Sequence, residues 1–560
     1  MKPVIYQLLP RLFGNRNDTL IHDGTISQNG CGKLADITPA VLRSIASLGC
    51  THVWLTGVIE HAHATVYPGI TPDNPQVVKG RAGSPYAISD YYDIDPDLAV
   101  DPQRRMEEFE ATVERVHHAG LRLVLDFVPN HVARRYHSDA RPADAPADLG
   151  ADDDTSVAFS ADNNFYYMPG CDFVPPVSAP DGCEPYRERP AKASGNDCFT
   201  PTPGRNDWYE TVKLNYGVDY TAGGVCHFNP VPSTWHKMIH ILLYWAGKGV
   251  DAFRCDMAHM VPLEFWTLAI STVKSRYPGV QFIAEIYDVA LYRDYIFKGG
   301  FVYLYDKVNL YDTLRAIQTG GLTASAVTGA WMTVDGLESH LLNFLENHDE
   351  QRYASDFYAS DPMRVVPALA VAALIGRGAM MIYAGQELGE RGMDCEGFSG
   401  RDGRTTIFDY WSLSTLRRWL GPKGRPSETL LTPRERSLRD VYGRILPLCN
   451  SLRAISDGDF FDVMYANREN PTVRLHEHYV WVRHCGEEVI VVAANFSCTS
   501  ADMLLTLPEH LFATTGLRPK AKAQITDLMG NTPVYQAPFR ASDPLPVYIP
   551  AQSVAILTVK

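Results

Sequence analysis

Four carboxylates in this sequence stand within or directly after short apolar runs that are typical of buried strands. They are Asp126, Asp256, Glu285 and Asp349. Because side chains alternate along a strand, Arg254 and Asp256 point the same way, and we expect the guanidinium to favour the ionised form of this carboxylate. An ionised carboxylate facing a second, protonated carboxyl group can cleave a glycosidic bond.

The same carboxylates have two other interpretations. Arg254 and Asp256 could be an ion pair that closes a strand end, and a group of strand-end carboxylates could bind a divalent metal. A guanidinium would repel such a metal, and His131 and His348 each stand beside an asparagine rather than in a tight group of ligands. We therefore favour a glycosidase over a metal-dependent barrel hydrolase.

The apolar runs alternate with helical patterns along most of the chain. The eight runs cover residues 4–9, 51–55, 121–128, 249–256, 281–285, 301–307, 341–345 and 379–383. Helix start signals lie between them, such as Thr38 followed by Pro39 and Asp101 followed by Pro102. Eight strands alternating with helices predict an α/β fold whose parallel sheet closes into a (β/α)8 TIM barrel. The carboxyl ends of the strands then meet at one mouth, where the four carboxylates should converge.

Two segments depart from this alternation. Residues 132–228 are rich in Asp, Pro, Gly and Asn and show little periodicity, which predicts a subdomain inserted after the third strand. Residues 457–560 carry short strand patterns without long helices, which predicts a C-terminal all-β sandwich domain. We accordingly assign residues 1–131 and 229–456 to the catalytic barrel.

Composition excludes several classes of partner. The 560 residues carry a formal net charge of -14, which argues against nucleic acid or an anionic membrane surface as the main partner. No apolar run is long enough to span a membrane, and no leader pattern is seen, so we expect a cytoplasmic protein. The eleven cysteines lack CxxC spacing. Cys171, Cys183, Cys198 and Cys226 gather in one irregular stretch, where we expect free thiols, with disulfides as the alternative in an oxidising compartment.

Four short motifs carry a resemblance to a known family. Residues 126–131, 251–256, 283–285 and 344–349 read DFVPNH, DAFRCD, IAE and FLENHD. In order and spacing they resemble the four sequence blocks of the α-amylase family, glycoside hydrolase family 13. That family also has an insertion after the third strand and a β domain at the end, so the resemblance covers the whole chain.

The resemblance implies a role for each matched residue. Asp256 would be the nucleophile, Glu285 the general acid/base, and Asp349 the carboxylate that binds sugar hydroxyls and stabilises the distorted ring. Nearby anions would raise the pKa of Glu285, as an acid catalyst needs. The residues implied in substrate binding are Tyr86, Asp126, His131, Arg254, His259, Asn347 and His348. Tyr86 follows Pro85 where the family usually has glycine, and a core tyrosine is its alternative role.

The sequence departs from the family pattern at the positions of the calcium ligands. Asn130 matches a family calcium ligand, but Met260 stands where a histidine ligand is expected, with His259 one position early. A thioether is a poor ligand for a hard cation. We expect no cofactor for the chemistry and predict that this structural calcium site is absent or remodelled.

These observations predict a retaining hydrolase that cleaves α-1,4 bonds of starch, glycogen or maltooligosaccharides through a covalent intermediate. A 4-α-glucanotransferase shares the first half-reaction and is the nearest alternative. A catalytically inactive carbohydrate-binding protein is the alternative from another class, although all three catalytic carboxylates are present. We expect an α-glucan as partner and a monomer or small homo-oligomer.

Overall fold

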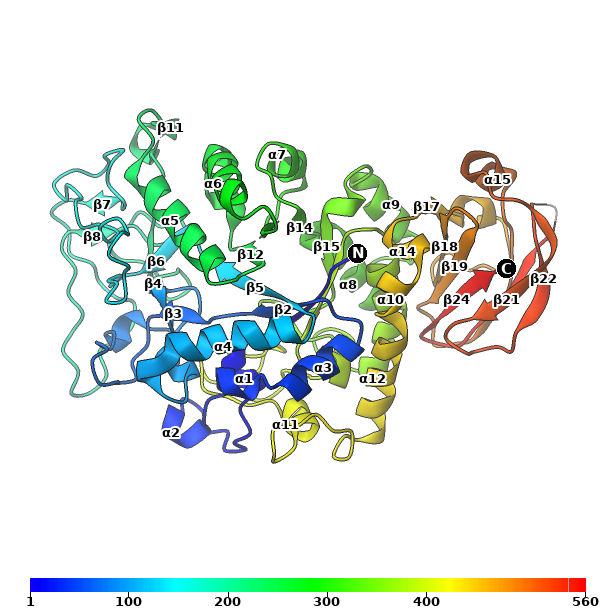
Figure 1. The fold of residues 1–560 in the computed structure, drawn as a ribbon, viewed down its shortest axis with the longest axis horizontal. Helices are drawn as coiled ribbons and strands as arrows, with labels where there is room; N and C mark the ends of the chain where they lie inside the picture. The colour runs from blue at the N-terminus through cyan, green and yellow to red at the C-terminus, as the bar shows by residue number, and fades with distance from the viewer. Residues whose placement is uncertain (542) are drawn as a thin grey trace.

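The computed structural model describes residues 1–541 and 543–560. Within these residues, eight parallel strands close into a barrel, with every strand hydrogen-bonded to its two neighbours (Figure 1). In barrel order they are β1 (Val4–Leu8), β2 (His52–Leu55), β5 (Arg122–Phe127), β12 (Ala252–Cys255), β13 (Gln281–Ala284), β14 (Tyr303–Tyr305), β15 (Leu341–Phe344) and β16 (Ala379–Tyr383). The predicted (β/α)8 barrel is confirmed.

Two of these strands are four residues shorter than the apolar runs that predicted them. The run 249–256 yields only β12, and the run 301–307 yields only β14. Gly249, the first residue of one run, and Gly300, just before the other, take the left-handed conformation with φ of 91° and 88° and turn the chain there. The apolar residues nearest these turns are buried in connections rather than in the sheet.

Helices cover the outside of the barrel in Figure 1. The longer ones are α3 (Pro39–Ser47), α4 (Arg105–His118), α5 (Ser233–Gly247), α6 (Leu263–Arg276), α10 (Val366–Leu374) and α12 (Pro433–Ile445). The predicted cap of α3 forms as expected, because the Thr38 side chain accepts a hydrogen bond from the Val41 amide. In α10 every side chain is buried, because this helix lies between the barrel and the C-terminal sheet.

The irregular segment after β5 contains only short strands. β6 (His131–Ala133) pairs antiparallel with β9 (Thr211–Lys213), which fixes the start and end of the segment beside each other. β7 (Tyr167–Met168) pairs with β8 (Ala191–Lys192), and β10 (Val218–Asp219) pairs with β11 (Val225–Cys226). The β6–β9 ladder therefore holds the inserted segment over the end of β5.

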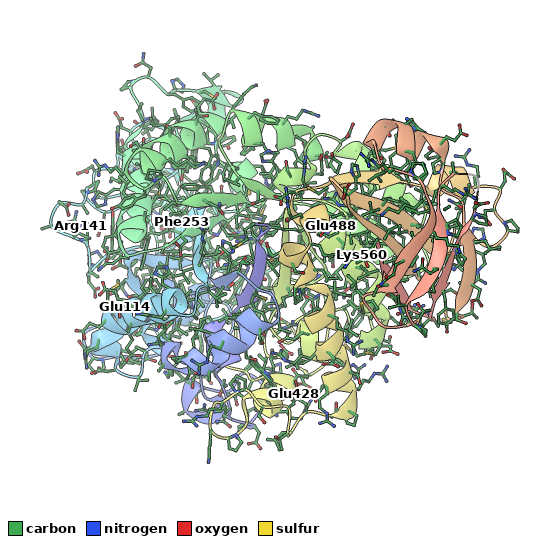
Figure 2. The ribbon with its side chains drawn as sticks, turned by 45° about the vertical axis from the view of Figure 1, so that its right-hand side comes forward. Glu114, Arg141, Phe253, Glu428, Glu488 and Lys560 are labelled. Atoms are coloured by element: carbon green, nitrogen blue, oxygen red, sulfur yellow. The ribbon has the colours of Figure 1, made fainter. Side chains whose placement is uncertain are left out.

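The end of the chain forms two antiparallel sheets. One contains β17 (Asp459–Asp462), β18 (His478–Cys485), β19 (Glu488–Asn495), β24 (Ser553–Val559), β21 (Lys520–Asp527) and β22 (Tyr535–Phe539), and the other pairs β20 (Ala501–Leu505) with β23 (Leu545–Ile549). The predicted all-β domain is confirmed, although it also carries the short helix α15 (Glu509–Thr515). In Figure 2, Glu488 and Lys560 lie in this domain, apart from Phe253 of the barrel. Among the residues described, no helix has the length and apolar character to cross a membrane.

Candidate active site

Arg254 lies at the centre of the barrel mouth and contacts three of the predicted carboxylates. Its Nη1 is 3.2 Å from Asp126 Oδ1 and 2.9 Å from Asp256 Oδ1, and its Nη2 is 2.7 Å from Glu285 Oε2. β5, β12 and β13 are neighbours in the sheet, with Arg254 in register with Asp126 on one side and Ile283 on the other. The barrel therefore brings together carboxylates from three strands, as the sequence predicts.

Arg254 is one of several influences on the pKa of Asp256. Burial raises the pKa of Asp256 well above its ordinary value, Arg254 opposes this, and Glu285, Asp126 and Asp349 raise it further. The guanidinium acts in the expected direction, but it is shared among three carboxylates. Arg254 therefore favours the ionised form of Asp256, as expected, but burial and the neighbouring anions outweigh its effect on the pKa.

The loop after β15 presents Asp349 to the same site. His348 Nε2 is 3.0 Å from Asp349 Oδ2, and Gln7 Nε2 lies 2.7 Å from His348 Nδ1, which fixes the ring orientation. Burial opposes ionisation of Asp349, but His348 and its hydrogen bond outweigh burial and lower the pKa of this carboxyl. The Asp349 side chain is 44% exposed, against 9% for Asp256 and 3% for Glu285. Asp349 is therefore the most accessible carboxylate of the three.

Neighbouring side chains pack against this cluster or hold its members in place by hydrogen bonds. Tyr86 stacks on His348 with ring centroids 5.2 Å apart, and its ring also packs against the Arg254 guanidinium. Trp54 Nε1 donates to Asp126 Oδ2 at 2.9 Å, while Asp126 Oδ1 contacts Arg254. Trp54 therefore helps to hold Asp126 beside the guanidinium. Asn347 accepts hydrogen bonds from the amides of Asp349 and Glu350 and thereby shapes the loop.

A cavity of about 340 Å³ lies beside the cluster. The predicted residues that line it are Tyr86, His131, Asp256, Glu285 and Asp349. His131 packs against Trp208, and burial, followed by Lys213 and Lys79, lowers the pKa of His131 to about 3, so its imidazole is neutral at physiological pH. His259 is not a lining residue of this cavity within the described chain; it lies beside Tyr287, with ring centroids 6.1 Å apart.

Several lining residues were not predicted from the sequence. Tyr287 hydroxyl donates to Glu285 Oε1, and the amide of Met257 donates to Glu285 Oε2 at 2.8 Å. Met257 takes the left-handed conformation with φ of 41°, an unusual backbone for a residue with a side chain, and this turn aims its amide at the acid. The position of Tyr287, two residues after Glu285, is the one signal that could have identified it.

An ion pair forms another part of the cavity wall. Lys79 Nζ lies 3.1 Å from Glu210 Oε1, and both side chains are buried. Lys79 comes from the loop before β4 (Ile88–Ile94), and Glu210 comes from the inserted segment just before β9. Both lie in irregular segments without periodicity, so no sequence pattern could have paired them.

The position of the implied calcium ligand is filled differently. Asn130 Oδ1 accepts a hydrogen bond from Lys213 Nζ at 2.9 Å, and the same ammonium lies 2.5 Å from Asp197 Oδ1. Asn130 Nδ2 donates to the Gly195 carbonyl at 2.7 Å. An ammonium at the asparagine oxygen would repel Ca²⁺ and compete for its ligand. The residues present do not fit a calcium ion at this position.

The fold is a closed parallel barrel with a group of carboxylates at the carboxyl ends of its strands. Residues 7–280 match the family model for the catalytic domain of α-amylase. Residues 7–280 therefore belong to the α-amylase family.

Individual relatives are more distant. An α-amylase from Haloarcula japonica is 25% identical over 393 residues, which are 70% of this chain and 44% of that protein. An α-1,4-glucan:maltose-1-phosphate maltosyltransferase from Picrophilus torridus is 23% identical over 292 residues, 50% of this chain and 32% of that protein. The chain thus spans less than half the length of these two relatives. A maltogenic α-amylase from Thermotoga neapolitana has a similar fold, with a TM-score of 0.60 at 18% identity over 100% of this chain and 98% of that one.

Proposed function

We propose that this protein is a retaining glycoside hydrolase that cleaves α-1,4-glucosidic bonds of starch, glycogen or maltooligosaccharides. The observation that supports it best is the position of Asp256 and Glu285 on the two terminal nitrogens of one guanidinium. The guanidinium donates a hydrogen bond to Asp256 and is in ion-pair contact with Glu285, so the two carboxyls are neighbours. Retention requires carboxyl groups about 5 to 5.5 Å apart, close enough for direct attack without an intervening water.

The proposed reaction has two steps. Asp256 attacks the anomeric carbon and forms a glycosyl ester, while Glu285 gives its proton to the departing glycosidic oxygen. Glu285, now ionised, then takes a proton from a water that attacks the same carbon and releases Asp256. The Met257 amide and the Tyr287 hydroxyl hold Glu285 in position for both steps.

The electrostatics of the cavity favour a neutral sugar substrate. Within the described residues, Lys79 is the basic side chain that lines the cavity, and Glu210 neutralises it. Arg254 is already shared by three carboxylates. A phosphorylated donor, which the name of the maltosyltransferase relative indicates for that protein, would meet mostly negative charge here. This favours hydrolysis or transfer of neutral glucan over use of a sugar phosphate.

A 4-α-glucanotransferase remains the second candidate, because the first step is the same. The competing acceptors in the second step are water and a sugar hydroxyl. The Asp349 side chain is 44% exposed, so water can reach the place where the glycosyl ester of Asp256 would form. This supports hydrolysis. Products longer than the starting maltooligosaccharide would favour the transferase.

Asp256→Asn is the direct test of the proposed activity. We expect the wild-type protein to release reducing sugar from maltooligosaccharides with retained α-configuration, seen by NMR of the fresh product. Loss of the nucleophile should lower kcat by about 10⁴-fold or more. Asp251→Asn is a matched control, because Asp251 precedes the opposite end of the same strand and its carboxylate contacts His117. Equal activity of Asp256→Asn and wild type would refute the proposal.

The remaining proposals concern the state of the protein. We propose that it needs no calcium at Asn130, because Lys213 supplies the positive charge there. We also propose a cytoplasmic location, which is consistent with the eleven cysteines being free throughout the described chain. We propose a monomer or small homo-oligomer, which sedimentation at several protein concentrations would test.

A further inference from the structure

A second cavity, of about 490 Å³, lies between the barrel and the C-terminal domain. We call it the junction cavity. One wall comes from α9 (Ala326–Thr333) and the start of β15, and the other comes from β17 and α15. Figure 1 places α9 and β17 next to each other at this boundary. Within the described residues it shares no lining residue with the active-site cavity, so it is a separate site.

Aromatic rings from both domains line the junction cavity. Trp331 of α9 packs against Phe460 of β17 with ring centroids 5.0 Å apart. Phe461 packs against Tyr465 and His510, with centroids 6.5 Å and 5.7 Å away. The Tyr465 side chain is half exposed. Ring faces that are open to solvent offer flat apolar surfaces on which another flat or ring-shaped molecule can stack.

The polar groups of the junction cavity are mainly acceptors. Asp306 Oδ1, Asn343 Oδ1 and Glu338 Oε2 are buried and have no hydrogen-bond partner among the described residues. In the same part of the chain, neither lysine nor arginine lines this cavity. Buried acceptors without partners are costly, and a bound molecule rich in hydrogen-bond donors would satisfy them. The junction cavity therefore fits a guest that brings hydroxyl or amino groups.

The carboxylates around the cavity disfavour an anionic guest. Asp462 already accepts hydrogen bonds from Thr328, Trp331 and Tyr479. Arg377 lies 3.2 Å from Glu338 and 3.7 Å from Asp459, and balances their charge. Burial raises the pKa of Asp306 to about 7, so this carboxyl is not fully ionised at neutral pH. The remaining negative charge, which includes that of the exposed lining residue Asp335, disfavours an anionic guest. A quaternary ammonium ion has no hydrogen-bond donor and leaves the unpartnered acceptors unsatisfied, whereas a neutral guest with hydroxyl groups satisfies them.

We propose that the junction cavity is a second carbohydrate site, which binds glucose units of an α-glucan chain away from the catalytic carboxylates. Sugar rings present apolar faces that stack on aromatic side chains and hydroxyls that donate to acceptors, and the volume lies in the range of small-ligand sites. The choice of α-glucan rests on the proposed function of the barrel. Holding one chain at two sites would raise the local concentration of polymer at the active site.

Binding is measured with the full-length Asp256→Asn protein, so that the probe is not consumed. Calorimetric titration with maltoheptaose should show two classes of site. Tyr465→Ala and His510→Ala, both exposed positions at the cavity, should each weaken one class at least tenfold. Tyr548→Ala is the matched control, since Tyr548 is a partly exposed tyrosine on β23 that does not line the cavity within the described residues.

Three results would overturn the inference. They are a single class of site in Asp256→Asn, unchanged affinity of both sites in Tyr465→Ala and His510→Ala, and Tyr465-dependent binding of tetramethylammonium in place of maltoheptaose. The inference and the proposed function can fail separately. A wild-type protein without turnover, but with Tyr465-dependent maltoheptaose binding, would refute the hydrolase and leave the second site standing.

Discussion

Two buried cations, Arg254 and Lys213, differ in the groups that they contact. Arg254 contacts three carboxylates at the barrel mouth, whereas Lys213 contacts one amide oxygen and one half-exposed carboxylate, Asp197, at the base of the inserted segment. The planar guanidinium fixes the directions of its partners, and the ammonium acts as a compact point charge. The first arrangement gathers the proposed reacting groups, and the second joins two parts of the chain.

The two clusters also differ in charge balance. Around Arg254, anions outnumber the cation, and burial with these neighbours raises the pKa of Asp256. Around Lys213, burial lowers the pKa of the ammonium, and Asp197 partly restores it. A group with excess like charge is unfavourable for folding, and such groups are typical of sites selected for chemistry. The comparison predicts that changes at Arg254 affect rate and changes at Lys213 affect stability.

Arg254→Lys should give the largest effect. A lysine keeps the charge but cannot hold Asp256 and Glu285 on two nitrogens at once, so the reacting carboxyls lose their orientation. We expect kcat/KM to fall about 10³-fold, comparable with removal of an oriented charge-stabilising donor. The measurement is reducing-sugar release from maltotriose, with circular dichroism to show that the fold persists. A loss smaller than tenfold would mean that the guanidinium fork does not position the carboxyls.

The pH dependence of activity should reveal the raised pKa of Asp256. The nucleophile must be ionised, so kcat/KM should fall tenfold for each pH unit below the raised pKa. The acidic limb should therefore lie above the ordinary value of 3.8. A profile that stays flat down to pH 4 would show that Arg254 dominates after all.

The free energy of unfolding should also depend on the ionisation of Asp256. Ionisation raises activity but lowers stability. The folded chain holds the Asp256 proton to higher pH than the unfolded chain does. The stabilisation is therefore fully present at low pH and is lost as pH rises through the raised pKa. Urea unfolding of wild type and Asp256→Asn between pH 4 and 8 tests this, since the difference between the two proteins should grow in favour of the variant as pH rises.

Lys213→Met should lower stability more than activity. The change removes hydrogen bonds from a charged donor to Asn130 and Asp197, and we expect a loss of about 2 kcal/mol in the free energy of unfolding. Activity per folded molecule should stay within about threefold, because the polar partners of the ammonium within the described residues are Asn130 and Asp197, and neither is a proposed catalytic carboxylate. A large loss of kcat with normal stability would reverse the comparison.

Removal of calcium should have the smallest effect. If Lys213 provides the positive charge at Asn130, a chelator has nothing to withdraw there, and the melting temperature of wild type should not change. Addition of Ca²⁺ to Lys213→Met is the sharper experiment, because the freed oxygens of Asn130 and Asp197 could then accept the ion. A fall of several degrees on chelation of the wild type would contradict the assignment.

The sequence by itself determined the barrel and the four carboxylates at its mouth. Strand and helix patterns are local, and parallel strands must end on the same side, so Asp126, Asp256 and Glu285 could be brought together without coordinates. The tertiary structure decided the rest, because its contacts join irregular loops. Lys79 with Glu210, Lys213 with Asn130, and the aromatic walls of the junction cavity depend on how distant segments pack, and the net effect of burial and three anions on Asp256 depends on distances that no sequence pattern contains.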